Sequence, residues 1–210
     1  MPGRMAGRVA LVTGGGGGIG EATGRLFAEE GAAVALVDSD KAAVEAAAAG
    51  IVKAVAGARV SALAADLTSE PESQRVVDAT LAAFGALHTL VNVAGVRLYT
   101  PLAEADAKGW EFIFGVNVLA TAYCCKVALP ALRQGGRGTI VNLSSVYGVK
   151  GRAGMDGYLD SNFEKAKALL KEGGYDGTPI VLMVALDLSW FGGASSTLSD
   201  LTTPSSTIIE

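Results

Sequence analysis

Short apolar runs alternate along the chain with longer segments in which apolar residues recur at helical spacing. The apolar runs predict β-strands at 8–14, 33–38, 59–67, 89–95, 138–145 and 179–186. The longer segments predict helices at 20–32, 41–56, 69–84, 108–133 and 163–172. Continuous apolar strands that alternate with helices are typical of a parallel sheet covered on both faces. With right-handed crossovers, the pattern predicts an α/β fold with a doubly wound parallel sheet.

Two predicted helices carry an apolar row that we expect to face the sheet. In the first helix the row consists of Ala22, Leu26 and Phe27. In the last helix it consists of Ala166, Leu169 and Leu170. A helix followed by the apolar run 179–186 is what a sixth parallel strand needs. The final segment, 189–210, is rich in Ser, Thr and Gly and lacks periodicity, so we expect it to be loose.

Composition and charge narrow the class of protein. The chain has 210 residues, half of them apolar, and a net charge of -4, which fits one globular domain and makes nucleic acid an unexpected partner. The N-terminus has no apolar signal region and no run of 18 apolar residues occurs, so we expect neither a signal peptide nor a membrane span. Cys124 and Cys125 are adjacent and form no disulfide framework, which favours reduced thiols and a cytoplasmic protein. We expect no metal site.

A glycine-rich turn joins the first predicted strand to the first predicted helix. It reads TGGGGGIG and spans residues 13–20. A strand, a glycine turn and a helix in this order are typical of dinucleotide binding. Glycines let the backbone approach a pyrophosphate, and the N-terminus of the helix offers N–H groups and a positive dipole end. The alternative is a flexible glycine loop without a ligand.

Asp38 ends the second predicted strand, where a carboxylate can accept hydrogen bonds from the adenosine ribose. A negative charge at this place repels a 2′-phosphate, and the glycine turn contains no Lys or Arg to attract one. The sequence therefore predicts NAD as the cofactor in preference to NADP. The alternative is that Asp38 is a turn residue at the end of a strand.

On these motifs and their order the chain resembles the short-chain dehydrogenase/reductase family, from residue 1 to about 158. The family's TGxxxGxG loop is matched by Thr13, Gly14, Gly18 and Gly20. Its later motifs are matched by Asp66 and Leu67 after the third strand, by NVAG at 92–95 after the fourth, by Asn117, by Ser145, and by Tyr158 thirteen residues further on.

The resemblance implies a Rossmann fold and an NAD(P)-dependent oxidoreductase that acts on a secondary alcohol or carbonyl compound. It implies cofactor binding by Gly14, Gly17, Gly18, Ile19, Gly20, Asp38, Asp66, Leu67, Asn92, Ala94 and Gly95. It also implies catalysis by three residues: Tyr158 exchanges the hydroxyl proton, Ser145 bonds the substrate oxygen, and Asn117 holds a water of the proton relay. A homodimer through the helix that contains Asn117 is a further expectation, with Phe112, Val116, Leu119 and Tyr123 available.

The family's lysine, four residues after the tyrosine, is replaced by Asn162. A free tyrosine has a pKa of about 10, and a nearby cation lowers it toward the range that acid–base catalysis needs. Asn162 can hydrogen-bond a ribose but carries no charge. The neighbouring lysines Lys150, Lys165 and Lys167 are interpreted as surface residues. Three interpretations follow: an active oxidoreductase, a dinucleotide-binding module with little turnover, or a chimera without activity.

The segment after Tyr158 resembles a second family. Residues 162–184 are similar to a fragment of the solute-binding proteins of peptide-type ABC transporters, through the run KAKALLKEGGYDGTPI. The short-chain family's Pro-Gly turn after strand six is missing, so we expect a C-terminally altered fold. The predicted organisation is a dinucleotide-binding domain at 1–158, a foreign helix–strand segment at 159–188 that completes the sheet, and a tail at 189–210.

Overall fold

Six strands form one parallel sheet in the computed structural model, which describes residues 3–98, 100, 104–136, 138–145 and 180–184. The strands are β1 (Val9–Thr13), β2 (Ala33–Asp38), β3 (Arg59–Ala64), β4 (Thr89–Asn92), β5 (Thr139–Ser144) and β6 (Ile180–Val184). Their order across the sheet is β3-β2-β1-β4-β5-β6. This order confirms the doubly wound sheet, and every strand lies within the apolar run that predicted it.

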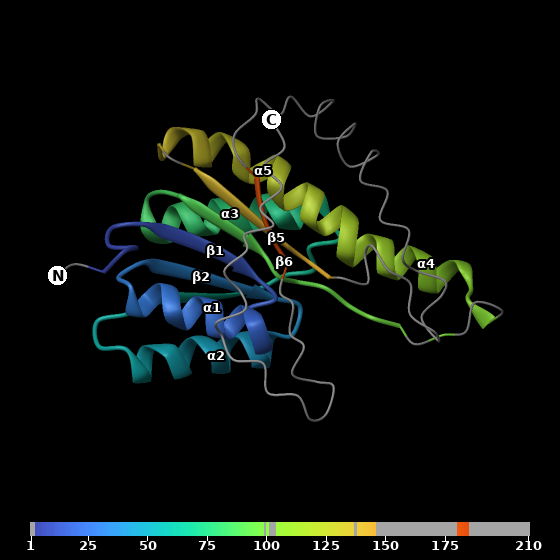
Figure 1. The fold of residues 1–210 in the computed structure, drawn as a ribbon, viewed down its shortest axis with the longest axis horizontal. Helices are drawn as coiled ribbons and strands as arrows, with labels where there is room; N and C mark the ends of the chain where they lie inside the picture. Colours follow the sequence, from blue (N-terminus) through green and yellow to red (C-terminus); the bar gives the residue numbers. More distant parts are fainter. Residues whose placement is uncertain (1–2, 99, 101–103, 137, 146–179, 185–210) are drawn as a thin grey trace, which may run out of the picture.

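Helices cover both faces of the sheet, as Figure 1 shows, with α1 and α2 on one side and α3 and α5 on the other. Their bounds are α1 (Gly18–Glu29), α2 (Lys41–Ala54), α3 (Glu70–Phe84), α4 (Ala107–Phe114) and α5 (Ala120–Gln134). Two helices begin with a capping carboxylate: Asp40 Oδ1 accepts from the Ala43 N–H at 3.0 Å, and Asp106 Oδ1 from the Gly109 N–H at 2.8 Å.

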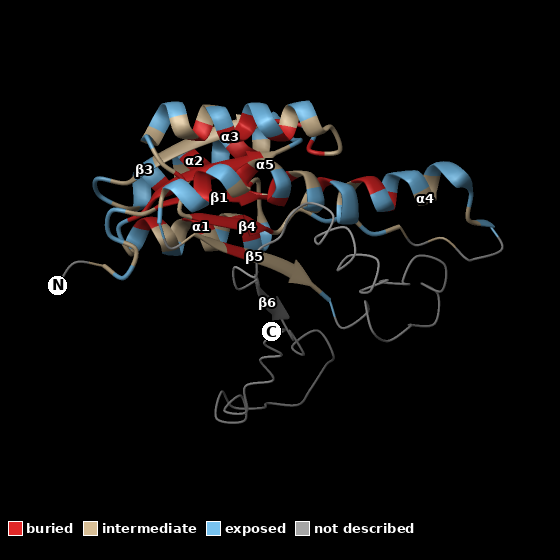
Figure 2. Ribbon diagram, turned by 90° about the horizontal axis from the view of Figure 1, so that it is seen from above, coloured by how far each residue is buried: buried red, intermediate tan, exposed pale blue. Residues whose placement is uncertain are grey.

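The core has two layers because successive side chains of a strand point to opposite faces. One layer joins the sheet to α3 and α5, and the other joins it to α1 and α2. All five residues of β1 are buried, since this strand has neighbours on both edges and helices on both faces. Figure 2 shows these buried residues gathered in the central strands and the inner faces of the helices. The carboxyl ends of the central strands are thereby held in a fixed arrangement.

The apolar row predicted for the first helix is correct only at Phe27, which is half-buried and packs against the core, whereas Ala22 is exposed. Leu26 is 50% exposed, and the buried residues of α1 are Gly20, Gly24 and Ala28. Between α1 and the sheet the space is filled by Leu36 of β2, because a Cβ on Gly24 would lie only 2.6 Å from Leu36 Cδ2. Small residues therefore let α1 approach β2 closely, and Leu26 faces away from this contact.

The helix predicted at 108–133 is present as one continuous helical run, Ala107–Gln134, which contains a π-helical turn. A π-helical turn, Gly115–Leu119, separates α4 from α5 and has Asn117 at its centre. Such turns occur frequently at functional sites. By length and apolar composition the whole run Ala107–Gln134 could also cross a membrane, although the core helix of a packed domain meets the same criterion. The buried residues of α5 belong to the core it shares with the sheet and α3.

The predicted helix at 163–172, with its apolar row, lies outside the described residues. Tyr158, Asn162 and the final segment 189–210 lie outside them as well. The strand predicted at 179–186 is present as β6, which pairs in parallel with β5 from Ile140 opposite Ile180 to Ser144 opposite Val184. The prediction of a sixth parallel strand is thus confirmed for its backbone.

Candidate functional site

The glycine turn between β1 and α1 has the backbone that an anion site requires. Gly14 and Gly18 have φ values of 66° and 51°, in the left-handed region that favours glycine. A Cβ on Gly14 would also lie 2.9 Å from the Ala94 nitrogen. At Gly17 and Gly18, by contrast, an added Cβ would meet nothing within 4 Å. Gly17, the N-cap of α1, makes no side-chain hydrogen bond to the first N–H groups of the helix, which are the groups that anions bind.

Asp38 ties the glycine turn to the end of β2. Its Oδ2 accepts from the Gly16 N–H at 3.0 Å, and its Oδ1 accepts from the Asp40 N–H at 3.1 Å. A Cβ on Gly16 would lie 2.9 Å from this Oδ2, so glycine is needed for the approach. The carboxylate therefore sits directly beside the open end of α1, where the ribose of a dinucleotide would follow its pyrophosphate.

Thr13 joins the two halves of the sheet at their carboxyl edge. Its Oγ1 accepts from the N–H groups of Val93 and Ala94, each at 3.1 Å. These bonds span β1 and β4, the neighbours at which the strand order reverses, and ligands of doubly wound sheets bind at such a switch point. In the sequence, Thr13 is marked only by its place before the first glycine of the turn. It was not among the predicted site residues.

Asn92 holds β4 to β5 from inside the molecule. Only 3% of the residue is exposed, and its Nδ2 donates to Asn142 Oδ1 at 2.8 Å and to Cys125 Sγ at 3.4 Å. The structure thus directs this side chain into the layer under α5. Asn142 was also absent from our set, although β4 and β5 carry the matching runs TLVN and TIVN in register.

The two cysteines lie in the same layer and are both buried and free. Burial raises the pKa of Cys124 to about 11 and that of Cys125 to about 12. Thiols with such pKa values stay protonated near neutral pH, so neither is an activated nucleophile. Cys124 donates a weak hydrogen bond to Ser73 Oγ, and Cys125 accepts from Asn92 Nδ2 and donates to Asn142 Oδ1, so both thiols are held inside the core.

Asn117 binds the loop that follows β4 through both ends of its amide. Its Oδ1 accepts from the Val96 N–H at 2.8 Å, and its Nδ2 donates to the Val96 carbonyl oxygen at 3.0 Å. The side chain also passes Gly95, where an added Cβ would lie 3.4 Å from Asn117 Oδ1. Ser145 follows β5 directly and is exposed at the same edge of the sheet. The structure therefore places Asn117 beside Gly95, and it places Ser145 at the end of β5, the strand next to β4.

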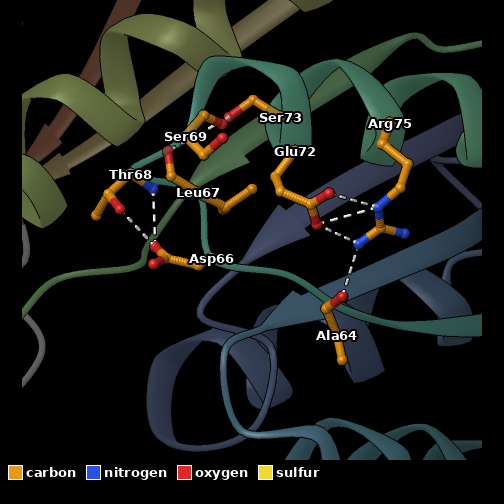
Figure 3. Close-up of polar contacts among 8 residues, drawn as sticks. All are labelled: Ala64, Asp66, Leu67, Thr68, Ser69, Glu72, Ser73 and Arg75. Carbon is orange, nitrogen blue, oxygen red and sulfur yellow. Dashed lines mark hydrogen bonds and ion pairs between the residues drawn. The ribbon is translucent and has the colours of Figure 1, made fainter.

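Asp66 lies after β3 at the far end of the same edge. It is exposed, and its Oδ1 accepts from the backbone N–H and the hydroxyl of Thr68 at 3.0 and 2.7 Å (Figure 3). The side chain of Leu67 is buried in the core with α3 and α5, so only the backbone atoms of this residue could contact a ligand. Ile19 is exposed on the first turn of α1. Among the residues that the structure describes, no group of three or more His, Cys, Asp or Glu side chains could hold a metal ion.

Comparison with known proteins agrees with this geometry. The family model for short chain dehydrogenases matches residues 8–166. The match passes the junction we predicted at residue 158 and includes Asn162. The chain is 38% identical over 160 residues to a 2,5-dichloro-2,5-cyclohexadiene-1,4-diol dehydrogenase of Sphingobium indicum, which covers 75% of this chain and 62% of that protein. It is 36% identical over 158 residues to a 2-(S)-hydroxypropyl-CoM dehydrogenase of Xanthobacter autotrophicus. The match covers 75% of this chain and 61% of that protein.

Solved structures show the same similarity. A short chain dehydrogenase/reductase from Burkholderia phymatum, in complex with NAD, superposes with a TM-score of 0.72 at 35% identity, over 81% of this chain and 60% of that one. Levodione reductase superposes with a TM-score of 0.77 at 28% identity, over 86% and 72%. The chain spans about three-fifths of the length of these two curated relatives.

Proposed function

Because the chain belongs to the short-chain dehydrogenase family, we propose that it binds NAD and acts as an oxidoreductase on a small secondary alcohol or carbonyl compound. The observation that carries the proposal is the open N-terminus of α1, with the Asp38 carboxylate bonded to its glycine turn at Gly16. A Cβ on Gly17 or Gly18 would meet nothing within 4 Å, and Gly17 makes no side-chain hydrogen bond to the first N–H groups of the helix, which are the groups that anions bind.

Asp38 supports NAD as the preferred cofactor. A ribose with two free hydroxyls can donate to this carboxylate, whereas a 2′-phosphate would meet its negative charge. No Lys or Arg lies in the glycine turn to offset that repulsion. The related structure from Burkholderia phymatum was solved with NAD, which is consistent with the same preference here.

The catalytic roles are assigned to this chain's own residues as follows. Bound NAD would accept or supply the hydride. Ser145, at the end of β5, would donate a hydrogen bond to the substrate oxygen, and Tyr158 would exchange the proton of that oxygen. Because Val96 engages both ends of the Asn117 side chain, we assign the water of the proton relay to the backbone carbonyl of Asn117, whose oxygen has two lone pairs.

A second function, dinucleotide binding with little turnover, is favoured by Asn162. Without a cation four residues after Tyr158, nothing at that position lowers the tyrosine pKa from about 10. The glycine turn and Asp38, which carry the proposed cofactor site, keep the residue types that the family resemblance implies. We keep as proposals that residues 162–184 derive from a solute-binding protein of an ABC transporter and that the protein is cytoplasmic.

We also propose a homodimer through the helix that contains Asn117. Figure 2 shows α4 largely exposed and extending beyond the sheet. Phe112 is 48% exposed and Leu119 41%, and these apolar side chains lie near the half-buried Val116 and Tyr123 of the same helical run. An isologous pairing of two such helices would remove this apolar surface from water.

Calorimetric titration with NADH and NADPH tests the proposal directly. We expect NADH to bind in the micromolar range and much more tightly than NADPH. Absence of binding by both nucleotides would refute the cofactor assignment. Asn162→Lys then separates the two functions: a gain of turnover on alcohols supports the oxidoreductase with a replaced lysine, while unchanged inactivity with intact NADH binding supports the binding module.

A further inference from the structure

His88, the only histidine of the chain, holds the first residue of β1 with two of its own atoms. The Val9 carbonyl oxygen accepts from the His88 backbone N–H at 2.9 Å, and the Val9 N–H donates to His88 Nδ1 at 3.0 Å. The parallel pairing of β1 with β4 begins one residue later, with Ala10 opposite Thr89. The imidazole therefore supplies the acceptor for the Val9 N–H at the point where the pairing of the two strands starts.

The bond from Val9 defines the state of the imidazole. A backbone N–H can only donate, so His88 Nδ1 carries a lone pair and the proton of the neutral ring lies on Nε2. An imidazolium has an N–H group at both nitrogens, so it cannot accept this bond. The bond between Val9 and His88 Nδ1 thus exists only while the ring is neutral.

The surroundings of the ring oppose its protonation. Burial lowers the pKa of His88, and the positive charge of Arg8 acts in the same direction. The last turn of α5 carries a further cation, Arg133, and β5 begins with the uncharged Thr139, whose N–H donates to the His88 carbonyl oxygen at 3.0 Å. The C-terminal end of α5 favours an imidazolium, but its partial charge is only about half an elementary charge. The neutral ring is therefore the favoured form in the folded protein.

The ring also has little room to turn away from Val9. Gly135, the residue that ends α5, lies against it: a Cβ at this position would be 3.3 Å from His88 Cδ2 and 2.7 Å from the Leu87 carbonyl oxygen. Val9 is only 3% exposed, so water does not freely replace the imidazole as the acceptor. Protonation should therefore separate the start of β1 from β4, because a rotated side chain cannot relieve the contact between two donors.

We propose that His88 is an acid-sensitive latch, which fastens the start of β1 to β4 while the ring is neutral and releases it once the ring is protonated. When the strand end is open, the imidazole has its ordinary pKa of about 6.5. Opening therefore takes up a proton, and it becomes easier as the pH falls below that value. The inference is independent of the proposed function, because Val9 begins the strand whose other end, Thr13, leads into the glycine turn.

Nitrogen-15 NMR of the imidazole tests the first part of the proposal on the wild-type protein. A single histidine gives a single set of ring signals, so the assignment is unambiguous. We expect the proton of the neutral ring on Nε2 at pH 7.5, and a titration midpoint below the ordinary value of about 6.5. A proton on Nδ1, or a midpoint at or above the ordinary value, would overturn the proposal.

Amide hydrogen exchange of the full chain tests the release. The internal control is Ala33, whose N–H donates to the Arg8 carbonyl oxygen at 2.9 Å, an acceptor that does not titrate. Between pH 7.5 and pH 5 the protection factor of Val9 should fall by about tenfold or more, and that of Ala33 by less than about twofold. His88→Asn, whose Oδ1 accepts without titrating, should keep Val9 protected at both pH values. His88→Leu, which has no acceptor, should leave Val9 poorly protected at both.

Each outcome of the exchange experiment bears on the latch. Equal losses of protection at Val9 and Ala33 would show a general destabilisation by acid and would overturn the proposal. Full protection of Val9 at pH 5 would overturn it as well. The same fall at Val9 in His88→Asn would assign the effect to another titrating group. If His88→Leu does not fold, the wild-type protein and His88→Asn still decide between these results.

Discussion

Replacing Thr13 with valine removes one hydroxyl from the point where the glycine turn meets the loop after β4. That oxygen accepts from the Val93 and Ala94 N–H groups, each at 3.1 Å. Thr13 is only 2% exposed, so water cannot freely take the place of the hydroxyl. Valine has nearly the same shape, and the substitution therefore takes away the acceptor while the packing stays in place.

The expected loss follows from the two N–H groups left behind. A buried donor without a partner costs about 1–3 kcal/mol. Both donors are only partly buried, so we expect the free energy of unfolding to fall by about 2–4 kcal/mol. This is a large part of the roughly 5–15 kcal/mol that stabilises an ordinary domain. Thr13→Ser keeps the oxygen and loses one methyl group, so it should cost only about 1 kcal/mol.

Urea unfolding, followed by circular dichroism, measures both variants against wild type. Thr13→Val should unfold at a clearly lower urea concentration than Thr13→Ser, with an unchanged slope. If the two variants lose equal stability, the hydroxyl does not hold the two loops together and the reasoning is wrong. NADH titration adds a functional readout, because freed loops at the switch point should weaken dinucleotide binding in the valine variant alone.

Three further predictions follow from single contacts. Gly14→Ala should lower the free energy of unfolding in urea by at least about 2 kcal/mol, because Gly14 has a positive φ and lies close to Ala94. Gly17→Ala should lower it by less than about 1 kcal/mol, and equal losses in the two variants would contradict this reasoning. Burial, with the nearby Arg8 charge, lowers the pKa of His88 in the folded protein below its ordinary value of 6.5. The protein should therefore lose stability as the pH falls below 6.5, because the unfolded chain binds the proton more readily. His88→Asn should remove this part of the pH dependence, measured as the difference in unfolding free energy between pH 7.5 and pH 5. Leu119→Glu should raise the dissociation constant of the dimer by at least about tenfold in sedimentation analysis, and a monomeric wild-type protein would contradict the proposed interface.

The strands and the doubly wound parallel sheet were predictable because strands that are covered on both faces are apolar throughout. A strand such as β1, covered on both faces, has to be apolar throughout, and its run VALVT is. The glycine turn could also be predicted from the sequence, because its backbone conformation requires residues without a Cβ. Both features depend on local sequence and on one general rule of layer packing.

Features that depend on a distant partner were not predictable. The face of α1 is decided by Leu36, a residue of β2 that fills the space a larger helical side chain would need. The π-helical turn accompanies the bond between Asn117 and Val96, which are 21 residues apart. The inward direction of Asn92 depends on Asn142, 50 residues further on. In each case the helical or strand pattern was right, and a long-range contact decided the detail.

The bond from Gly16 to Asp38 has a consequence for how cofactor preference can change in this protein. The carboxylate that would exclude a phosphorylated ribose also anchors the glycine turn. A single substitution that admits NADP by removing the charge would release the turn at the same time. Evolution or engineering toward the other cofactor would thus pass through a weak binder of both, unless a second change supplied a neutral acceptor for the Gly16 N–H.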